Sequence, residues 1–163
     1  LHPIPASMTV TVSLTGIAPF IEHELDTAMR LLVLEADKAI KENTPVDTGR
    51  LAASWMIGKN GDTSGNPVPP GKYVGISRPK GSNFQPSKVT AGTTYSIHNN
   101  LPYAEANCGY SSGFPASWKG QFKSGNKAKG EGPKVKPGWF ELIAKNLGPR
   151  SVEIWEDIAR RSN

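Results

Sequence analysis

The segment TPVDTGRL, residues 44–51, decides how this chain folds. Pro45 disfavours the helical conformation at the residue before it, so a helix that approaches from upstream has to end here. Asp47 can accept hydrogen bonds from the amides that follow it, and Gly49 can adopt a positive φ. The segment therefore predicts a tight corner, in which Asp47 can also cap one brief helical turn.

The residues around this corner predict a helix before it and a strand after it. Residues 20–43 carry apolar side chains at steps of three and four, which is the period of a helix. The middle of this helix is apolar nearly all round, so we expect it to be buried on two sides. After the corner, Leu51, Ala53, Trp55 and Ile57 lie at every second position, which is the period of a strand.

Other alternating segments predict strands at residues 9–14, 72–77 and 93–99. Between them, residues 58–71 and 78–92 are rich in Gly, Pro and Ser and predict two long loops, the first of them mobile. Loops of this length are commonly functional or become ordered by partners.

The C-terminal part predicts two short helices. Pro137-Gly138 opens an apolar pattern that starts at Trp139, and Gly148-Pro149 is expected to end it. Ser151 is then suited to cap a last amphipathic helix. The fold class we predict is α+β, with a long N-terminal helix packed on a small, largely antiparallel sheet, extended loops and a C-terminal helix.

Length and composition indicate one such domain. The chain has 163 residues and a net charge of +5, which mildly favours an anionic partner. We expect residues 1–16 to form an arm with a possible strand, and residues 17–163 to form the domain, with a Lys- and Gly-rich insertion at 116–136. A single cysteine leaves no internal disulfide, so we expect synthesis in a reducing compartment. No signal peptide or membrane span is expected.

Two patterns raise the question of catalysis. Asp47-Thr48-Gly49 is the triplet that carries the catalytic aspartate in homodimeric, retroviral-type aspartic proteases. In those enzymes the triplet follows a strand and precedes a small residue, whereas here it follows a helix and precedes Arg50. His98 and Cys108 suggest a base with a thiol, although an inert buried or interface cysteine is the commoner case. We therefore expect no enzyme activity.

Ligand-binding patterns are sparse, with one exception. The three His and one Cys give no set with metal-site spacing, and no glycine-rich phosphate loop is present, so we expect neither metal nor cofactor. The exception is the insertion, whose lysines are candidates for contact with DNA or a partner protein. The alternative is that these lysines form a solvated loop and only keep it soluble. They are Lys119, Lys123, Lys127, Lys129, Lys134 and Lys136.

Two motifs resemble a known family. The corner with the Ser-Trp that follows it is similar to the signature of the tail-completion or neck proteins of tailed bacteriophages, which are related to the phage lambda tail-completion protein. Residues 100–104, Asn-Leu-Pro-Tyr-Ala, with Gly109 resemble the second hallmark of that family. The Pro-Gly that leads into the C-terminal helix follows more than twenty residues later here, which is why the lysine-rich segment reads as an insertion.

The resemblance implies a structural virion protein of the head-tail junction, made in the host cytoplasm. It implies a ring, of about six or twelve copies, that joins the capsid connector to the tail and lines the DNA passage. The implied neighbours are head-completion and tail-terminator or tail-tube proteins, with genomic DNA in the channel and no membrane. The residues expected to form the structural motif are Pro45, Asp47, Thr48, Gly49, Arg50, Leu51, Trp55, Pro102, Tyr103, Ala104 and Gly109.

Overall fold

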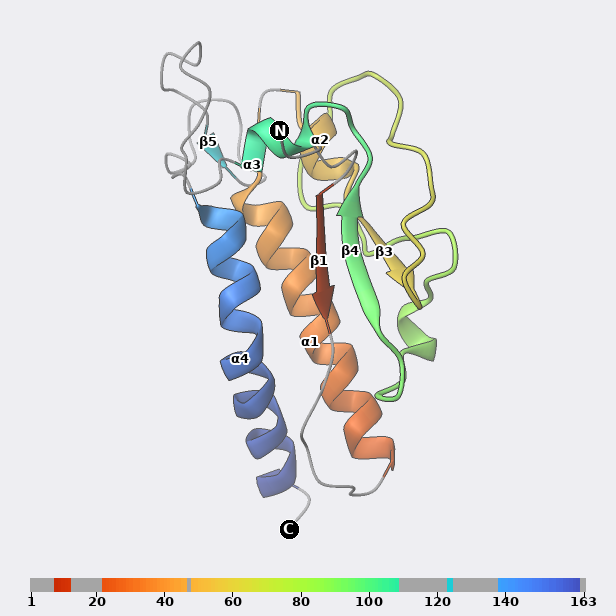
Figure 1. The fold of residues 1–163 in the computed structure, drawn as a ribbon, viewed down its shortest axis with the longest axis vertical. Helices are drawn as coiled ribbons and strands as arrows, with labels where there is room; N and C mark the ends of the chain where they lie inside the picture. The colour runs from red at the N-terminus through yellow and green to blue at the C-terminus, as the bar shows by residue number, and fades with distance from the viewer. Residues whose placement is uncertain (1–7, 13–21, 47, 109–122, 125–137, 162–163) are drawn as a thin grey trace, which may run out of the picture.

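Two long helices lie side by side against one face of a three-stranded antiparallel sheet, as Figure 1 shows for the computed structural model. The structure describes residues 8–12, 22–46, 48–108, 123–124 and 138–161. Its elements are β1 (Met8–Val12), α1 (Glu22–Asn43), β2 (Pro45–Val46), α2 (Arg50–Ala53), β3 (Met56–Lys59), the 3-10 helix η1 (Pro86–Lys88), β4 (Tyr95–Asn99), α3 (Ala104–Cys108), β5 (Lys123–Ser124) and α4 (Trp139–Arg161). The predicted α+β class is confirmed.

The main sheet has the order β1-β4-β3, with β4 in the centre. Val10 and Ile57 both lie opposite Ile97, on the face that the helices cover. The strand predicted at 93–99 is confirmed as β4, and the strand predicted at 9–14 corresponds to β1 among the residues described. Because successive side chains of a strand point to opposite faces, Ser96 and His98 project away from the helices.

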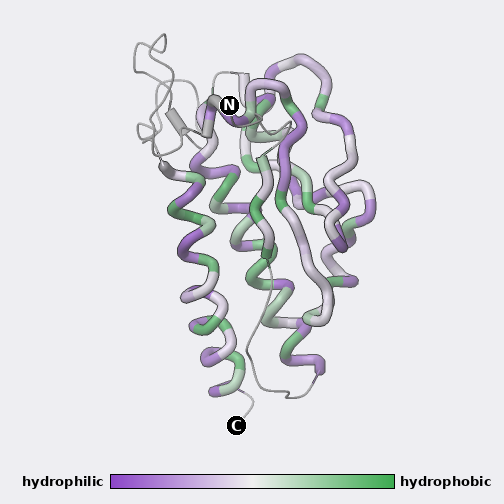
Figure 2. The backbone as a smooth tube through the Cα atoms, viewed as in Figure 1, coloured by the Kyte–Doolittle hydropathy of each residue, from purple (hydrophilic) through white to green (hydrophobic). Residues whose placement is uncertain are grey.

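The first long helix, α1, is confirmed over Glu22–Asn43, and its predicted burial on two sides has two causes. It packs on the sheet, and it also packs along α4 over much of its length. Figure 2 shows hydrophobic residues recurring at helical spacing along both helices. None of the helices in the described residues is long and apolar enough to cross a membrane.

The C-terminal helix differs from the prediction of two short helices. α4 runs without a break from Trp139 to Arg161 and contains Pro149 in its interior. Ser151 does not cap a new helix; its hydroxyl donates to the carbonyl of Gly148 at 2.6 Å. Buried residues before and after the proline, Phe140 and Ile154, hold both halves against the core, so tertiary packing outweighs the one amide that proline lacks.

Two strand predictions were wrong. Residues 50–53 form the helix α2, which is the brief helical turn that the sequence left open, and the strand begins only at Met56. Leu51, Ala52 and Ala53 are all buried, so the apolar run had no true period of two. Residues 72–77 form no strand. Gly75 has a φ of +83° and Val74 is 90% exposed, so this segment has neither an extended backbone nor a buried face.

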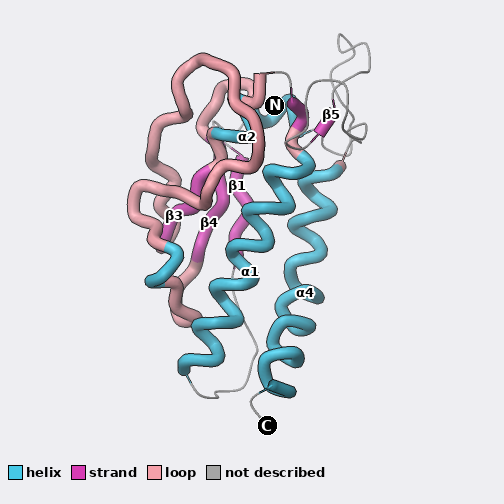
Figure 3. The backbone as a smooth tube through the Cα atoms, turned by 180° about the vertical axis from the view of Figure 1, so that it is seen from behind, coloured by secondary structure: helices cyan, strands magenta, loops and turns pink. Residues whose placement is uncertain are grey.

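The connection between β3 and β4, residues 60–94, contains only η1 and lies at the β3 edge of the sheet, away from α4 (Figure 3). It closes that edge, because the amide of Ile57 donates to the carbonyl of Lys80 at 2.8 Å and that of Lys59 donates to the side chain of Asn83 at 2.9 Å. The two predicted loops are therefore confirmed as loops, except that β3 extends to Lys59. The mobility of the first stays a prediction.

Candidate functional site

Gly49 holds the backbone of the predicted corner in the left-handed region, with a φ of +82°. A Cβ at this position would lie 2.1 Å from the carbonyl oxygen of Tyr73, whose own amide donates to the carbonyl of Thr48 at 2.7 Å. Gly49 is thus required twice, for its backbone conformation and for the close approach of the loop. Pro45 lies in β2, immediately before the corner.

Arg50 begins α2 and binds the 60–94 loop. Its Nε donates to the carbonyl of Val68 at 2.9 Å, while Asp47 of the expected structural motif lies outside the described residues. The amide of Val68 in turn donates to the hydroxyl of Ser54 at 3.2 Å. Both ends of α2 therefore bind the same residue of the 60–94 loop.

Trp55 is fully buried behind the corner. Its Nε1 donates to the hydroxyl of Thr44 at 2.9 Å, and that hydroxyl donates to the carbonyl of Ile40 at 2.7 Å. The indole ring stacks on Phe140 with 5.6 Å between ring centroids and 16° between ring planes. Trp55 therefore joins the end of α1, the corner and the first turn of α4.

Asn99 brings the second motif to the same place. Its Nδ2 donates to the carbonyl of Leu51 at 2.9 Å, and its Oδ1 accepts from the amide of Leu101 at 3.1 Å. Leu51, Asn99 and Leu101 are all buried. Sequence reasoning did not single out Asn99, because the partner of its side chain is distant in the sequence.

The residues after Asn99 turn into α3. The amide of Ala104 donates to the carbonyl of Leu101 at 3.0 Å, and Ala104 is buried. Pro102 and Tyr103 are exposed, and Tyr103 presents 41% of its surface to solvent. Gly109 lies outside the described residues. The second motif therefore combines buried positions that fix the turn with an exposed aromatic residue.

The insertion also reaches this corner. Its two described residues, Lys123 and Ser124, form β5 and pair antiparallel with β2, so that Val46 lies opposite Lys123. The other candidate lysines, Lys119, Lys127, Lys129, Lys134 and Lys136, lie outside the described residues. The corner segment, residues 44–55, thus contacts the second motif, α4 and the insertion.

A buried ion pair that the sequence reasoning missed lies one turn before the corner. Nζ of Lys41 donates to Oδ2 of Asp37 at 2.7 Å, and both side chains are almost fully buried. The ammonium group also contacts the carbonyls of Ser77 at 3.1 Å and Arg78 at 3.4 Å. Burial raises the pKa of Asp37 above its usual value, and Lys41 offsets part of that rise. The sequence signal for this buried ion pair is the i, i+4 spacing of two opposite charges within an apolar part of the predicted helix.

Lys80 extends this polar cluster from the 60–94 loop. Its Nζ donates to the carbonyl of Ala53 at the end of α2, and burial lowers the pKa of its ammonium group. Lys41 and Lys80 together bind the segment around residues 77–80 to α1 and α2. We infer that these contacts hold the 60–94 loop in position beside the corner segment.

The residues considered for catalysis and metal binding have structural contacts or lie apart in the described part of the chain. Nε2 of His98 contacts the carbonyl of Ser64 at 3.1 Å, which is a structural role for the histidine. The side chain of Cys108 is outside what the structure describes. No three His, Cys, Asp or Glu side chains of the described residues come together as a metal-binding group.

The arrangement around the corner is therefore one of packing and hydrogen bonding, suited to presenting loops on a rigid base. Comparisons with protein-family models, with curated proteins and with solved structures give no significant match. The likeness to neck proteins therefore remains a prediction from the two motifs.

Proposed function

We propose that this chain is a structural subunit of the head-tail junction of a tailed bacteriophage. In this proposal it assembles into a ring that joins the capsid connector to the tail and surrounds the DNA passage. The observation that carries the proposal is the pair of hydrogen bonds made by the side chain of Asn99, to the carbonyl of Leu51 in the first motif and from the amide of Leu101 in the second, which brings the two motifs of the resemblance together in one buried corner. Because residues of both motifs contribute to one structural unit, we treat the two motifs as a single feature of the fold.

The surface of the domain suits a closed ring. A ring with rotational symmetry needs two different, complementary surfaces on each subunit. α4 and the 60–94 loop lie on opposite sides of the domain (Figures 1 and 3). On α4, Leu142 is 58% and Val152 is 50% exposed, and on the loop one large apolar side chain, that of Val74, is 90% exposed. Head-completion and tail-terminator or tail-tube proteins are the expected further neighbours.

The direct test of this function is a joining assay. Heads and tails from a lysate that lacks this subunit are mixed with the purified protein, and complete particles are counted by electron microscopy. The proposal predicts that the protein restores joining and that Asp47→Asn restores it equally. Loss of peptide cleavage in Asp47→Asn would instead favour the aspartic protease, and DNA binding without any joining would favour a nucleic-acid-binding module.

A further inference from the structure

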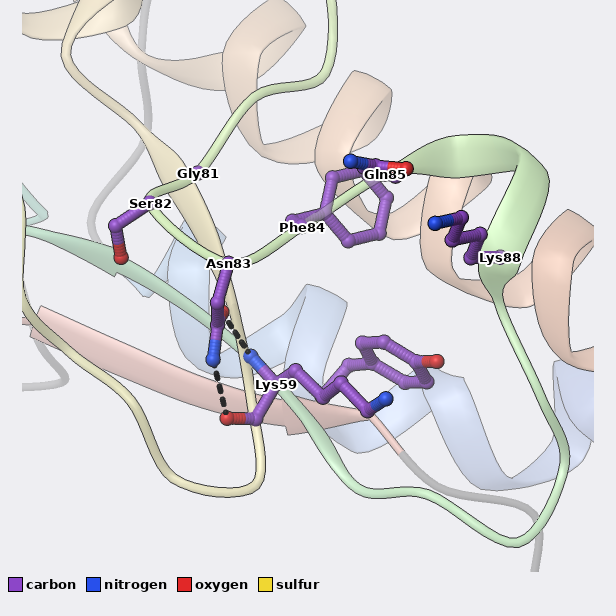
Figure 4. A pocket seen from close by; sticks show the side chains of 8 residues that line it. Lys59, Gly81, Ser82, Asn83, Phe84, Gln85 and Lys88 are labelled. Carbon is purple, nitrogen blue, oxygen red and sulfur yellow. Dashed lines mark hydrogen bonds between the residues drawn. The ribbon is translucent and has the colours of Figure 1, made fainter.

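A hollow of about 410 Å³ opens between the end of β3, η1 and the loop that precedes η1 (Figure 4). Its volume lies in the range of about 300–1,000 Å³ that is usual for binding pockets. Phe84 and Tyr95 form part of its wall, and their rings meet edge to face with 6.1 Å between centroids. Both rings are buried, so this side of the hollow is well supported.

Two ammonium groups border the hollow, and they come from separate elements. Lys59 ends β3 and Lys88 ends η1, and Figure 4 shows their side chains on opposite sides of the space. Neither forms an ion pair with any carboxylate of the described residues, whereas Lys38 and Lys41 on α1 each have one. Among the described residues that line the hollow there is no Asp and no Glu. Two positive charges therefore face the space without a counter-charge from the described chain.

Two other polar residues of the lining, Asn83 and Tyr95, form hydrogen bonds that hold it together. Asn83 accepts from the amide of Lys59 at 2.9 Å and donates to the carbonyl of the same residue at 3.1 Å. The hydroxyl of Tyr95 accepts from the amide of Thr90 at 3.0 Å. These bonds fix the loop and the end of β3 relative to one another, and they leave the lysine ammonium groups as the charged groups available to a ligand.

One carboxylate lies at the rim, and it too is occupied. Asp62 accepts from the hydroxyl of Ser82 at 2.7 Å and from the amide of Ser64 at 2.8 Å. These hydrogen bonds hold the pKa of Asp62 at about 2, well below its usual value. Asp62 orders the loop beside the hollow and is not an ion-pair partner of Lys59 or Lys88.

We propose that this hollow binds an acidic segment of another protein chain, with a carboxylate side chain placed between Lys59 and Lys88. Duplex DNA fits less well, because it is bound through many phosphates by cations on an accessible surface, whereas two cations are found among the described residues that line this concave site. A single carboxylate side chain is small enough for a hollow of about 410 Å³, and the two lysines that border the space supply the opposite charge. The proposal does not depend on ring assembly, so either can fail without the other.

The test uses a hexaglutamate peptide with blocked ends and a fluorescent label, titrated with the full chain in low salt. Wild type is compared with Lys59→Gln/Lys88→Gln and with the control Lys72→Gln/Lys145→Gln, which removes equal charge from exposed lysines outside the hollow. We expect the first variant to bind about tenfold more weakly and the control to bind like wild type. Equal weakening in both variants would mean general charge attraction and would overturn the proposal.

Amide chemical shifts locate the bound probe. The peptide should shift the amides of Lys59 and of residues 82–88 and leave those of α4 unchanged. If the peptide causes no shifts there, or if a short DNA duplex shifts the same amides while the peptide does not, the proposal is wrong. Both double variants should melt at the wild-type temperature, since none of the four ammonium groups that they remove has a partner among the described residues.

Discussion

The side chain of Asn99 hydrogen-bonds the carbonyl of Leu51 at 2.9 Å, and it does so with no access to solvent. This contact joins the end of the central strand β4 to the helix α2, which lies within the corner segment. The same side chain accepts from the amide of Leu101, so one residue fixes the geometry of both motifs.

Asn99→Ala should therefore lower the free energy of unfolding by about 2–3 kcal/mol, because it leaves the buried amide of Leu101 without a partner and removes one of the two donors to the carbonyl of Leu51, the other being the amide of Ser54. Asn100→Ala is the matched control. Asn100 donates to the carbonyls of Thr63 and Gly65 from a partly exposed position, and its loss should cost about 1 kcal/mol. Urea unfolding of the three proteins measures both, and equal losses in the two variants would argue against a special role of Asn99.

Gly49→Ala tests the corner itself. Gly49 and Gly75 have nearly the same φ, +82° and +83°, but a Cβ would strike Tyr73 only at Gly49, since nothing lies within 4 Å of it at Gly75. Gly75→Ala should cost about 1 kcal/mol of stability from its backbone conformation alone. Gly49→Ala should cost about 3 kcal/mol or more, because steric overlap is added. Similar melting temperatures for the two variants would show that the close approach is absent.

Lys41→Met should destabilise the fold by about 3–5 kcal/mol, because it leaves the carboxylate of Asp37 buried without its partner. Combining it with Asp37→Leu should recover at least about 2 kcal/mol relative to the sum of the single changes. Lys38→Met is the control: its pair with Glu42 has the same spacing on α1 but is exposed, so about 0.5 kcal/mol or less is expected. Additive effects of the two buried substitutions would contradict the pairing.

Gly148→Ala distinguishes one continuous C-terminal helix from two. Gly148 lies inside α4 and nothing lies within 4 Å of its added Cβ, so alanine should stabilise the protein by about 0.5–1 kcal/mol. Gly138 precedes the helix with a φ of +80°, and the same substitution there should destabilise by about 1 kcal/mol. Thermal melting of both variants gives the signs, and destabilisation by Gly148→Ala would indicate a break in the helix.

The sequence predicted those parts of the fold that local periodicity specifies. α1 and β4 were found because their apolar residues recur with one clear period. The apolar residues from Leu51 onward were wrongly predicted to start a strand. Ala52 and Ala53 are both buried, so the pattern of apolar residues does not distinguish a strand from a helical turn here. Gly148-Pro149 was interpreted as a break because local propensity takes no account of the packing of Phe140 and Ile154.

The sequence predicted only those features of the candidate site that depend on neighbouring residues in the chain. Gly49 could be recognised because a positive φ is a property of the turn itself. The role of Asn99 could not be recognised, since the carbonyl of Leu51 lies far away in the sequence. For Lys41, the i, i+4 spacing from Asp37 was a local signal, but the contacts with the carbonyls of Ser77 and Arg78 were not. The contact of Arg50 was likewise not predictable, because the carbonyl of Val68 lies 18 residues away in the sequence. Long-range partners of polar side chains are the information that a single sequence lacks.

The central claim, assembly into a ring, is tested most directly by native mass measured over a wide range of protein concentration, with particles imaged from the same samples. The account predicts closed rings of about six or twelve copies with a central hole, and no intermediate species once the ring has closed. A strict dimer at every concentration would contradict it and direct attention to Asp47 as the catalytic residue of a homodimeric protease.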